Sequence, residues 1–131
     1  MNQQLKPKEY DILQVLMQSD KPMTASEIVK TDDHLTVNTV QAILRRLSGM
    51  KLVEVADIVY SGNVLSRAFR PTADASEIIK QMFEEDVRQF QKIISKQSLL
   101  SAMLQAGSDK ESVRKDIEAL EDVLKNFKSR Q

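Results

Sequence analysis

The stretch TVNTVQAILRRL, residues 36–47, decides the fold of this chain because it predicts a helix with two unlike faces. Apolar residues recur at steps of three and four along one face: Val37, Val40, Leu44 and Leu47, with Ile43 close to them. The other face carries Asn38, Gln41, Ala42 and Arg45, with Thr39 and Arg46 at its flanks. No acidic residue occurs between His34 and Val53. The outer face therefore offers amides, a hydroxyl and guanidinium groups without a carboxylate.

These residue types match the chemistry by which a helix reads double-stranded DNA in the major groove. Asparagine and glutamine bond adenine through two atoms, arginine does the same with guanine, and threonine contacts a phosphate or a thymine methyl. Carboxylates would face phosphates, so their absence favours the same interpretation. The candidate DNA-binding residues on this helix are Thr36, Asn38, Thr39, Gln41, Arg45 and Arg46. A polar helix surface without a ligand is the simpler alternative, and the neighbouring elements weigh against it.

The segments around this helix predict a winged helix. Pro7 suits the first turn of a first helix, and Thr24 and Glu27 form the capping box of a short second helix. Thr36 is expected to cap the third helix, and Ser48-Gly49 to close it. Two strands follow, LVEVADIVY and VLSRAFRP, joined by the turn SGN. We therefore predict a winged-helix DNA-binding domain over residues 1–73.

The predicted hairpin would be the wing, residues 53–71, which lies on the DNA backbone in folds of this kind. Its second strand carries Arg67 and Arg70, and no acid occurs from Ile58 to Ala73. We expect both arginines to contact phosphates. A simple turn with solvated arginines fits the same residues equally well.

The remainder of the chain, residues 74–131, has helical spacing and no strand pattern. It carries more apolar residues than three short helices can bury by themselves, so we expect a homodimer formed by this helical region. The expected interface residues are Phe83, Phe90, Ile94, Leu99, Leu100, Met103, Leu104, Val113, Ile117, Leu120, Leu124 and Phe127. The predicted fold class is mainly α with a small β-hairpin: an N-terminal winged helix-turn-helix plus a C-terminal helical dimerisation region.

Composition narrows the class of protein. The 131 residues include no cysteine and equal numbers of basic and acidic residues, 19 of each, so net charge alone does not suggest nucleic acid. No apolar run is long enough to span a membrane and no signal peptide is present, so we expect a cytoplasmic protein with no membrane partner.

No motif for catalysis, a metal or a cofactor is found, and we expect a protein that is not an enzyme and needs no cofactor. His34 is the single histidine and stands beside Asp32 and Asp33, but one nitrogen ligand is too few for a transition-metal site. The competing interpretation is a winged-helix module that contacts proteins without sequence-specific DNA binding.

The order EYDILQVLMQ, TASEIV, TVNTVQAILRRL, GMKLVE and AFRP, followed by a helical tail, resembles the penicillinase-repressor (BlaI/MecI) family of bacterial winged-helix regulators over nearly the whole chain. By position, Asn38, Thr39, Gln41, Ala42 and Arg46 match the DNA-facing helix positions of that family. Val37 stands where a proline is common, Asn38 replaces a lysine and Ala42 a threonine. We therefore expect an operator preference that differs from that of other family members. Lys51 stands in place of the usual turn glycine.

The resemblance implies a repressor that binds a dyad-symmetric operator as a homodimer through its C-terminal helices. It also implies release by a sensor protease that cleaves at a bond aligned with Ala102–Met103, where relatives have a polar residue before an aromatic one. The copper-responsive branch of the family carries paired C-terminal cysteines, which this chain does not have.

Overall fold

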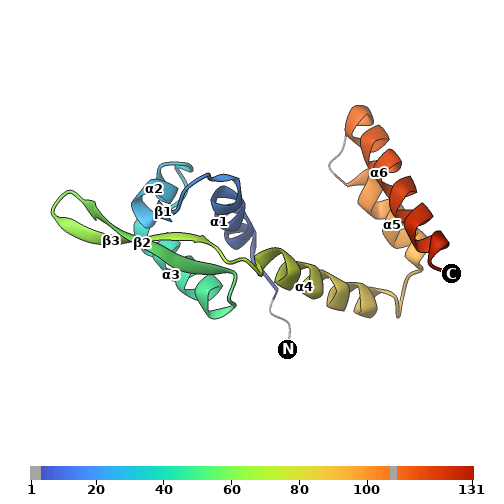
Figure 1. Ribbon diagram of the computed structural model, residues 1–131, viewed down its shortest axis with the longest axis horizontal. Helices are drawn as coiled ribbons and strands as arrows, with labels where there is room; N and C mark the ends of the chain where they lie inside the picture. Colours follow the sequence, from blue (N-terminus) through green and yellow to red (C-terminus); the bar gives the residue numbers. More distant parts are fainter. Residues whose placement is uncertain (1–3, 107–108) are drawn as a thin grey trace. The chain divides into compact units, whose positions relative to one another are not determined.

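The computed structural model describes residues 4–106 and 109–131, and its elements follow the order of a winged helix with a helical tail (Figure 1). The first half contains three helices, the short strand β1 and a hairpin among its described residues, and only helices follow. The elements are α1 (Pro7–Gln18), β1 (Met23–Thr24), α2 (Ala25–Val29), α3 (Val37–Gly49), β2 (Val53–Ser61), β3 (Val64–Pro71), α4 (Ala75–Phe90), α5 (Lys96–Gln105) and α6 (Lys110–Ser129).

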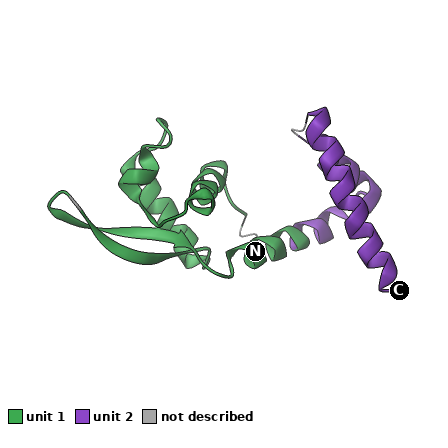
Figure 2. Ribbon diagram, turned by 45° about the horizontal axis from the view of Figure 1, so that its top comes forward, with its two compact units in different colours: residues 1–84 green, residues 85–131 purple. Residues whose placement is uncertain are grey.

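The chain divides into two compact units, the first ending at Glu84 and the second beginning at Glu85 (Figure 2). The first unit has one apolar core, to which α1, α2, α3 and the start of the hairpin contribute. Its largest fully buried side chains are Ile12, Leu16, Ile28, Val40, Leu44, Leu47 and Leu52. The predicted apolar stripe of the third helix is therefore confirmed at Val40, Leu44 and Leu47. Val37 does not belong to it, because this side chain is 39% exposed.

A three-stranded antiparallel sheet completes this unit, with the strand order β1-β3-β2. Strand β3 matches the predicted segment VLSRAFRP, and β2 is shifted by one residue from the predicted one. The two strands pair from Val53↔Pro71 to Ser61↔Val64, with an irregularity between Val55 and Asp57. Gly62 in the turn has φ 68°, the left-handed region in which glycine carries no steric penalty.

Strand β1 is an element that the sequence pattern does not predict, because two residues carry no periodic signal. Met23 pairs with Phe69 and Thr24 with Ala68, so the start of α2 is tied to the hairpin. Thr24 also caps α2 as predicted: its Oγ1 accepts from the Glu27 N–H at 3.2 Å, and Glu27 Oε1 accepts from the Thr24 N–H at 2.9 Å.

The end of α3 differs from the prediction that Ser48-Gly49 closes it. The helix includes Gly49, and the left-handed residue is Lys51, with φ 66°. The Leu52 N–H donates to the Leu47 carbonyl and the Lys51 N–H donates to the Ser48 carbonyl, both at 3.0 Å. This pattern is a Schellman motif, and it is favoured here by the burial of both Leu47 and Leu52.

The second unit contains α5 and α6, which contact each other and lie side by side (Figure 1). Ser95 caps α5 through the Ser98 N–H at 3.1 Å, which separates α5 from α4. The sequence SDKE, residues 108–111, predicts a capping box for α6 in which Ser108 is the cap, but Ser108 lies outside the described residues. The observed cap is Asp109, which accepts from the Ser112 N–H at 2.7 Å. Neither helix has a buried residue among its described positions.

Helix α4 crosses the boundary between the units. Ala75 is buried in the core of the first unit, and Ile78, Ile79 and Met82 pack against the same core. The first compact unit ends at Glu84. It therefore extends eleven residues beyond residue 73, the domain limit that the sequence suggested. Helical spacing alone could not show how far along α4 the core contacts continue.

Candidate nucleic-acid interface

The recognition-helix candidate α3 has a well-defined start. Thr36 is its N-cap: Oγ1 accepts from the Thr39 N–H at 3.2 Å and donates to the Thr39 hydroxyl at 2.9 Å. The predicted cap is thus confirmed, and it engages two of the predicted DNA-binding residues with each other. Their hydroxyls lie at the first turn of α3, where unpaired backbone N–H groups point outward.

Beyond this cap, α3 presents an exposed surface that contains most of the predicted contact residues. Asn38, Gln41, Ala42 and Arg45 are exposed, whereas Thr39 is half-buried. Val37 belongs to the same exposed surface, one helical turn before Gln41. The helix therefore buries a narrower stripe than its sequence suggested and leaves more of its side open to a partner.

A groove lies between this side of α3 and the wing. Its concave volume is about 530 Å³. Helix α3 lines it with Val37, Gln41, Leu44, Arg45 and Ser48; the other lining residues are Thr24, Ala25, Ser26, Val55, Val64, Leu65, Ser66, Arg67 and Phe69. None of these described lining residues is acidic. The fold thus brings the predicted contacts Gln41, Arg45 and Arg67 to one groove.

The four predicted arginines divide into two pairs. Arg45 and Arg67 line the groove, and neither is ion-paired to any residue in the described ranges. Arg70 is outside the groove and donates from Nε to Glu54 Oε2 at 2.8 Å, across the β2–β3 pair. Arg46 is also engaged, with its Nε 2.7 Å from Glu9 Oε2. Of these four arginines, Arg45 and Arg67 are the two without an ion pair among the described residues.

Glu27 follows the groove residues Ala25 and Ser26 of α2 but does not line the groove. The Thr24 N–H donates to this carboxylate, and that hydrogen bond is the main cause that holds the pKa of Glu27 below its usual value. Glu27 is therefore ionised and committed to its helix cap.

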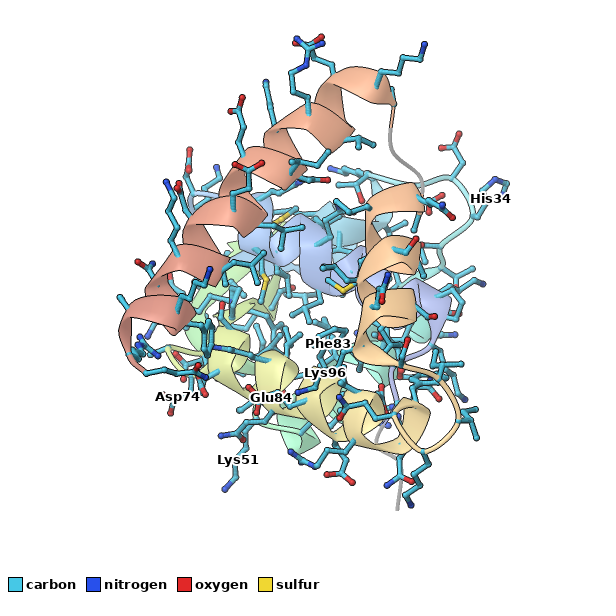
Figure 3. All side chains as sticks on the ribbon, turned by 90° about the vertical axis from the view of Figure 1, so that its right-hand side faces the viewer. His34, Lys51, Asp74, Phe83, Glu84 and Lys96 are labelled. Carbon is cyan, nitrogen blue, oxygen red and sulfur yellow. The ribbon has the colours of Figure 1, made fainter. Side chains whose placement is uncertain are left out.

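His34 lies in an exposed turn and projects away from the chain (Figure 3). Its backbone N–H donates to Asp32 Oδ1 at 2.9 Å. Within residues 4–106 and 109–131, no group of three or more histidine, cysteine, aspartate or glutamate side chains could hold a metal ion. The same residues include no helix that is long and apolar enough to cross a membrane.

The groove also contains residues that sequence reasoning missed, namely Ser26, Ser48, Val55 and Leu65. Ser26 lies inside the capping box, between Thr24 and Glu27, so this motif could have located it at the start of α2. Val55 and Leu65 could be assigned to the hairpin, but not to a side of it, because the irregularity after Val55 changes which residues share a face.

The predicted dimer residues remain accessible in the described chain. Phe83, Phe90, Ile94, Met103, Ile117, Leu124 and Phe127 are 41–60% exposed, and Leu99, Leu100, Leu104, Val113 and Leu120 are half-buried. Ala102 and Met103, at the predicted cleavage position, lie inside α5 and are exposed. The Ala102 carbonyl accepts from the Ala106 N–H at 3.0 Å.

Comparisons with known proteins agree with this architecture. A possible transcriptional regulator from Methanosarcina mazei Go1 has 13% identity and a TM-score of 0.53, with 67% of this chain and 75% of that chain covered. A mutant of MepR from a multidrug-resistant Staphylococcus aureus clinical isolate has 16% identity and a TM-score of 0.50, with 95% and 80% covered. At these identities the likeness shows a shared fold. No curated protein sequence matches the chain.

The model of one protein family, penicillinase repressor, matches residues 5–126. The match includes the winged helix, α4, α5 and most of α6. Family and fold are those of transcriptional regulators, a class of protein distinct from enzymes. The chain belongs to the penicillinase repressor family, and it is a winged-helix transcriptional repressor that binds DNA.

Proposed function

We propose that the protein binds a dyad-symmetric operator as a homodimer. Helix α3 would lie in the major groove of the DNA, and the protein groove between α3 and the wing would face the sugar–phosphate backbone. One observation carries the proposal: Gln41, Arg45 and Arg67 converge on a groove whose described lining has no acid. The amide suits a base edge and the two guanidinium groups suit phosphates. Such a protein would act in the cytoplasm, where its operator lies.

The second unit supports pairing with a second copy of the chain. The buried apolar core of the described chain ends at Ala75, so α5 and α6 contribute nothing to it. The apolar row Val113, Ile117, Leu120, Leu124 and Phe127 is the seam of α6, and on it Phe127 is 60% exposed and Leu124 is 58% exposed. A helix pair with this much accessible apolar surface needs a partner, and a second identical unit offers complementary apolar residues.

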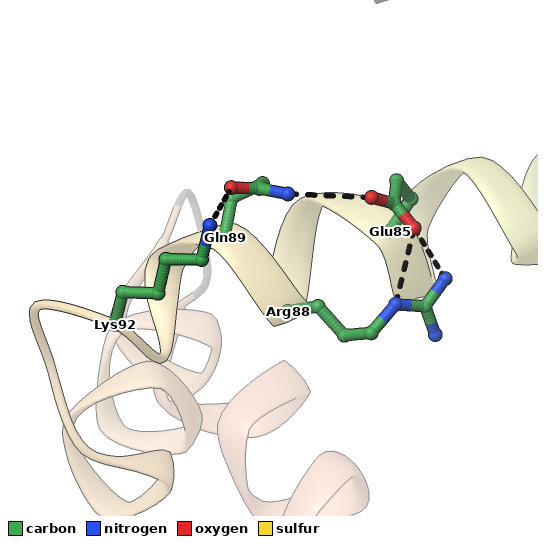
Figure 4. Close-up of polar contacts among 4 residues, drawn as sticks. All are labelled: Glu85, Arg88, Gln89 and Lys92. Carbon is green, nitrogen blue, oxygen red and sulfur yellow. Dashed lines mark hydrogen bonds and ion pairs between the residues drawn. The ribbon is translucent and has the colours of Figure 1, made fainter.

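Polar side chains on one side of α4 and just after its end bond to one another, and we expect such a partner to leave them in water (Figure 4). Arg88 Nε donates to Glu85 Oε2 at 3.1 Å, Gln89 Nε2 donates to Glu85 Oε1 at 3.3 Å, and Lys92 Nζ donates to Gln89 Oε1 at 2.8 Å. Hydrogen bonding from Arg88 is the main cause that lowers the pKa of Glu85. The apolar side chains Phe83, Val87 and Phe90 follow a separate row of α4 that would face the partner, and Ile94 lies just beyond the end of the helix.

The test is selection of bound sequences from a random pool of duplex DNA by the full-length protein. A two-fold symmetric consensus, with half-sites separated by about one turn or roughly 34 Å, would support the proposal. A single asymmetric site would contradict the homodimer, and the absence of any enriched sequence would contradict operator reading.

A protein-interaction module is the second candidate, and one observation favours it. The outer part of the wing is apolar: Ile58 is 60% exposed, Tyr60 76%, Val64 66% and Leu65 58%. Phosphate-contacting wings are expected to be basic, and Arg67 is the single arginine of this wing that is free of an ion pair in the described chain. An operator complex in which the wing makes no DNA contact would leave this function as the better account of the wing.

For release of the operator we propose cleavage at Ala102–Met103, as the resemblance implies. Both side chains are accessible, but the bond lies within the hydrogen-bonded turns of α5, so the helix must open locally before a protease can bind it. Mass analysis of the protein from induced cells tests this route. Two fragments that meet at this bond would support it, and an intact chain that has left its promoter would exclude it.

A further inference from the structure

Adjacent arginines of α3 have different surroundings. Arg45 lines the groove between α3 and the wing. Arg46, one residue later, is directed to the N-terminal segment of the chain: its Nε is 2.7 Å from Glu9 Oε2, and its Nη2 donates to the Gln4 carbonyl at 3.0 Å. Because successive helical residues differ in direction by about a quarter turn, one arginine can face DNA while the next faces α1.

The partner of Arg46 is a buried carboxylate. Glu9 is 3% exposed, and it is the one acidic residue among the buried side chains of the described chain. Its other oxygen, Oε1, accepts from the Lys6 N–H at 2.8 Å. Both carboxylate oxygens are therefore bonded, and the negative charge depends on Arg46 for its only ion pair within the described residues. Loss of Arg46 would leave this buried charge without an ion-pair partner, which is costly.

The ion pair joins elements that are distant in sequence. The hydrogen bond from Arg46 reaches Gln4, 42 positions earlier in the sequence and next to the buried Leu5. The buried core beneath α3 is made of aliphatic side chains, whose attraction by itself has no directional preference for the rotation of the helix about its own axis. A bonded pair with fixed geometry sets that rotation more narrowly.

We infer that Arg46 is a positioning residue: through Glu9 it fixes the rotation of α3 on α1, so that Gln41 and Arg45 point into the groove, and it supports operator affinity without touching a phosphate. The inference rests on the proposed function of the groove. It assigns to Arg46 a role different from the DNA contact that the family pattern suggests for this position, and it makes Glu9 part of the DNA-binding machinery although Glu9 is buried.

The experiment measures operator affinity of the full-length protein as a function of salt concentration, at a temperature where circular dichroism shows each variant to be folded. The variants are Arg46→Gln, Glu9→Gln, the double variant Glu9→Gln/Arg46→Gln, and Arg45→Gln as the matched control. Arg45→Gln should reduce the slope of log K against log salt by about 0.9 for each phosphate that the side chain no longer neutralises. Arg46→Gln should weaken binding by about tenfold and leave the slope at the wild-type value.

The double variant separates a positioning role from direct binding of a phosphate. It removes the buried charge together with its partner, so it should fold even if Arg46→Gln does not, and it should bind more tightly than Arg46→Gln with the wild-type slope. A slope reduced by about 0.9 per phosphate in either Arg46 variant would overturn the inference, because Arg46 would then touch a phosphate. Unchanged affinity in both Arg46 variants would overturn it as well.

These outcomes differ from those that would refute the proposed function. If the wild-type protein binds no selected operator, or if Arg45→Gln leaves both affinity and slope unchanged, the groove is not the DNA interface, and the positioning role fails with it. If the wild-type protein and Arg45→Gln behave as expected while the Arg46 variants do not, only the positioning role is overturned.

Discussion

Gln41 is the residue of α3 that we propose reads a base. It is exposed, it lines the groove, and its amide both donates and accepts hydrogen bonds. Gln41→Ala should weaken operator binding by about 1–3 kcal/mol per half-site and relax the preference at one base pair. Affinity titration and a repeated DNA selection check both effects, with Gln14→Ala on the exposed side of α1 as the control. An unchanged consensus and affinity would mean that another element reads the bases.

Lys51 is the residue whose backbone carries the clearest strain. It has φ 66° at the end of α3, where a side chain is unfavourable by about 1–2 kcal/mol. Lys51→Gly should stabilise the protein by about 0.5–1 kcal/mol, because relief of this strain is partly offset by the greater freedom of glycine in the unfolded chain. The midpoint of urea unfolding measures the change.

Gly62→Ala provides the contrast for that measurement. Gly62 has φ 68° and open space around it, so an added methyl meets no atom within 4 Å and still imposes the left-handed penalty. This variant should be destabilised by about 1 kcal/mol. A lower stability of Lys51→Gly, with the expected destabilisation of Gly62→Ala, would show that the lysine side chain contributes more than its backbone costs.

Among the elements, α2 is short and depends on its capping box. Its carboxylate, Glu27, has a lowered pKa in the folded state, chiefly because the Thr24 N–H donates to it. A lowered folded-state pKa means that ionisation favours folding; this contribution is complete above the unfolded pKa, near 4.5, and is lost as pH falls through the folded value.

Stability should therefore respond to acid through this cap. The wild-type protein should be more stable than Glu27→Gln at neutral pH, and the difference should shrink once the pH falls below about 4.5. Urea midpoints of both proteins between about pH 7 and pH 3 measure it. A difference that stays constant over this range would show that the charge of Glu27 does not contribute to the cap.

For the whole molecule, the seam of α6 should decide the oligomeric state. Leu120 is half-buried in the middle of that seam. Leu120→Asp should prevent pairing, because a charge buried without a partner costs several kcal/mol, on the order of 3–5. Sedimentation velocity should show a monomer, and operator titration a weaker complex. Asn126→Asp adds the same charge at an exposed position of α6 and should stay dimeric. A wild-type protein that sediments as a monomer would contradict the dimer directly.

The first unit should be separable from the second at Glu84. A fragment of residues 1–84 keeps Ala75, Ile78, Ile79 and Met82 on the core, whereas a fragment that ends at Asp74 lacks them. The longer fragment should fold as a monomer and bind the operator about 10²–10⁴-fold more weakly, since binding to the second half-site is no longer intramolecular. Circular dichroism and operator titration test it, and a fragment with full-length affinity would assign the second unit another role.

The sequence by itself determined the order of the helices and of the hairpin, though not β1, together with the caps of α2 and α3, the buried positions Val40, Leu44 and Leu47 of α3 and the extent of β3. These features depend on residues within a few positions of one another, which periodicity and capping patterns record. It also indicated Gln41, Arg45 and Arg67 as contact residues, because their types match DNA chemistry.

Only the tertiary structure distinguished Arg45 from Arg46, removed Arg70 from the groove and extended the first unit to Glu84. Each of these outcomes depends on a distant partner: the Arg46–Gln4 hydrogen bond spans 42 residues and the Arg70–Glu54 bond spans 16. An arginine free to meet a phosphate and one held by a buried carboxylate have the same side chain and the same local pattern. Their difference is created by the long-range packing that places Glu9 beside one and leaves the other facing the groove.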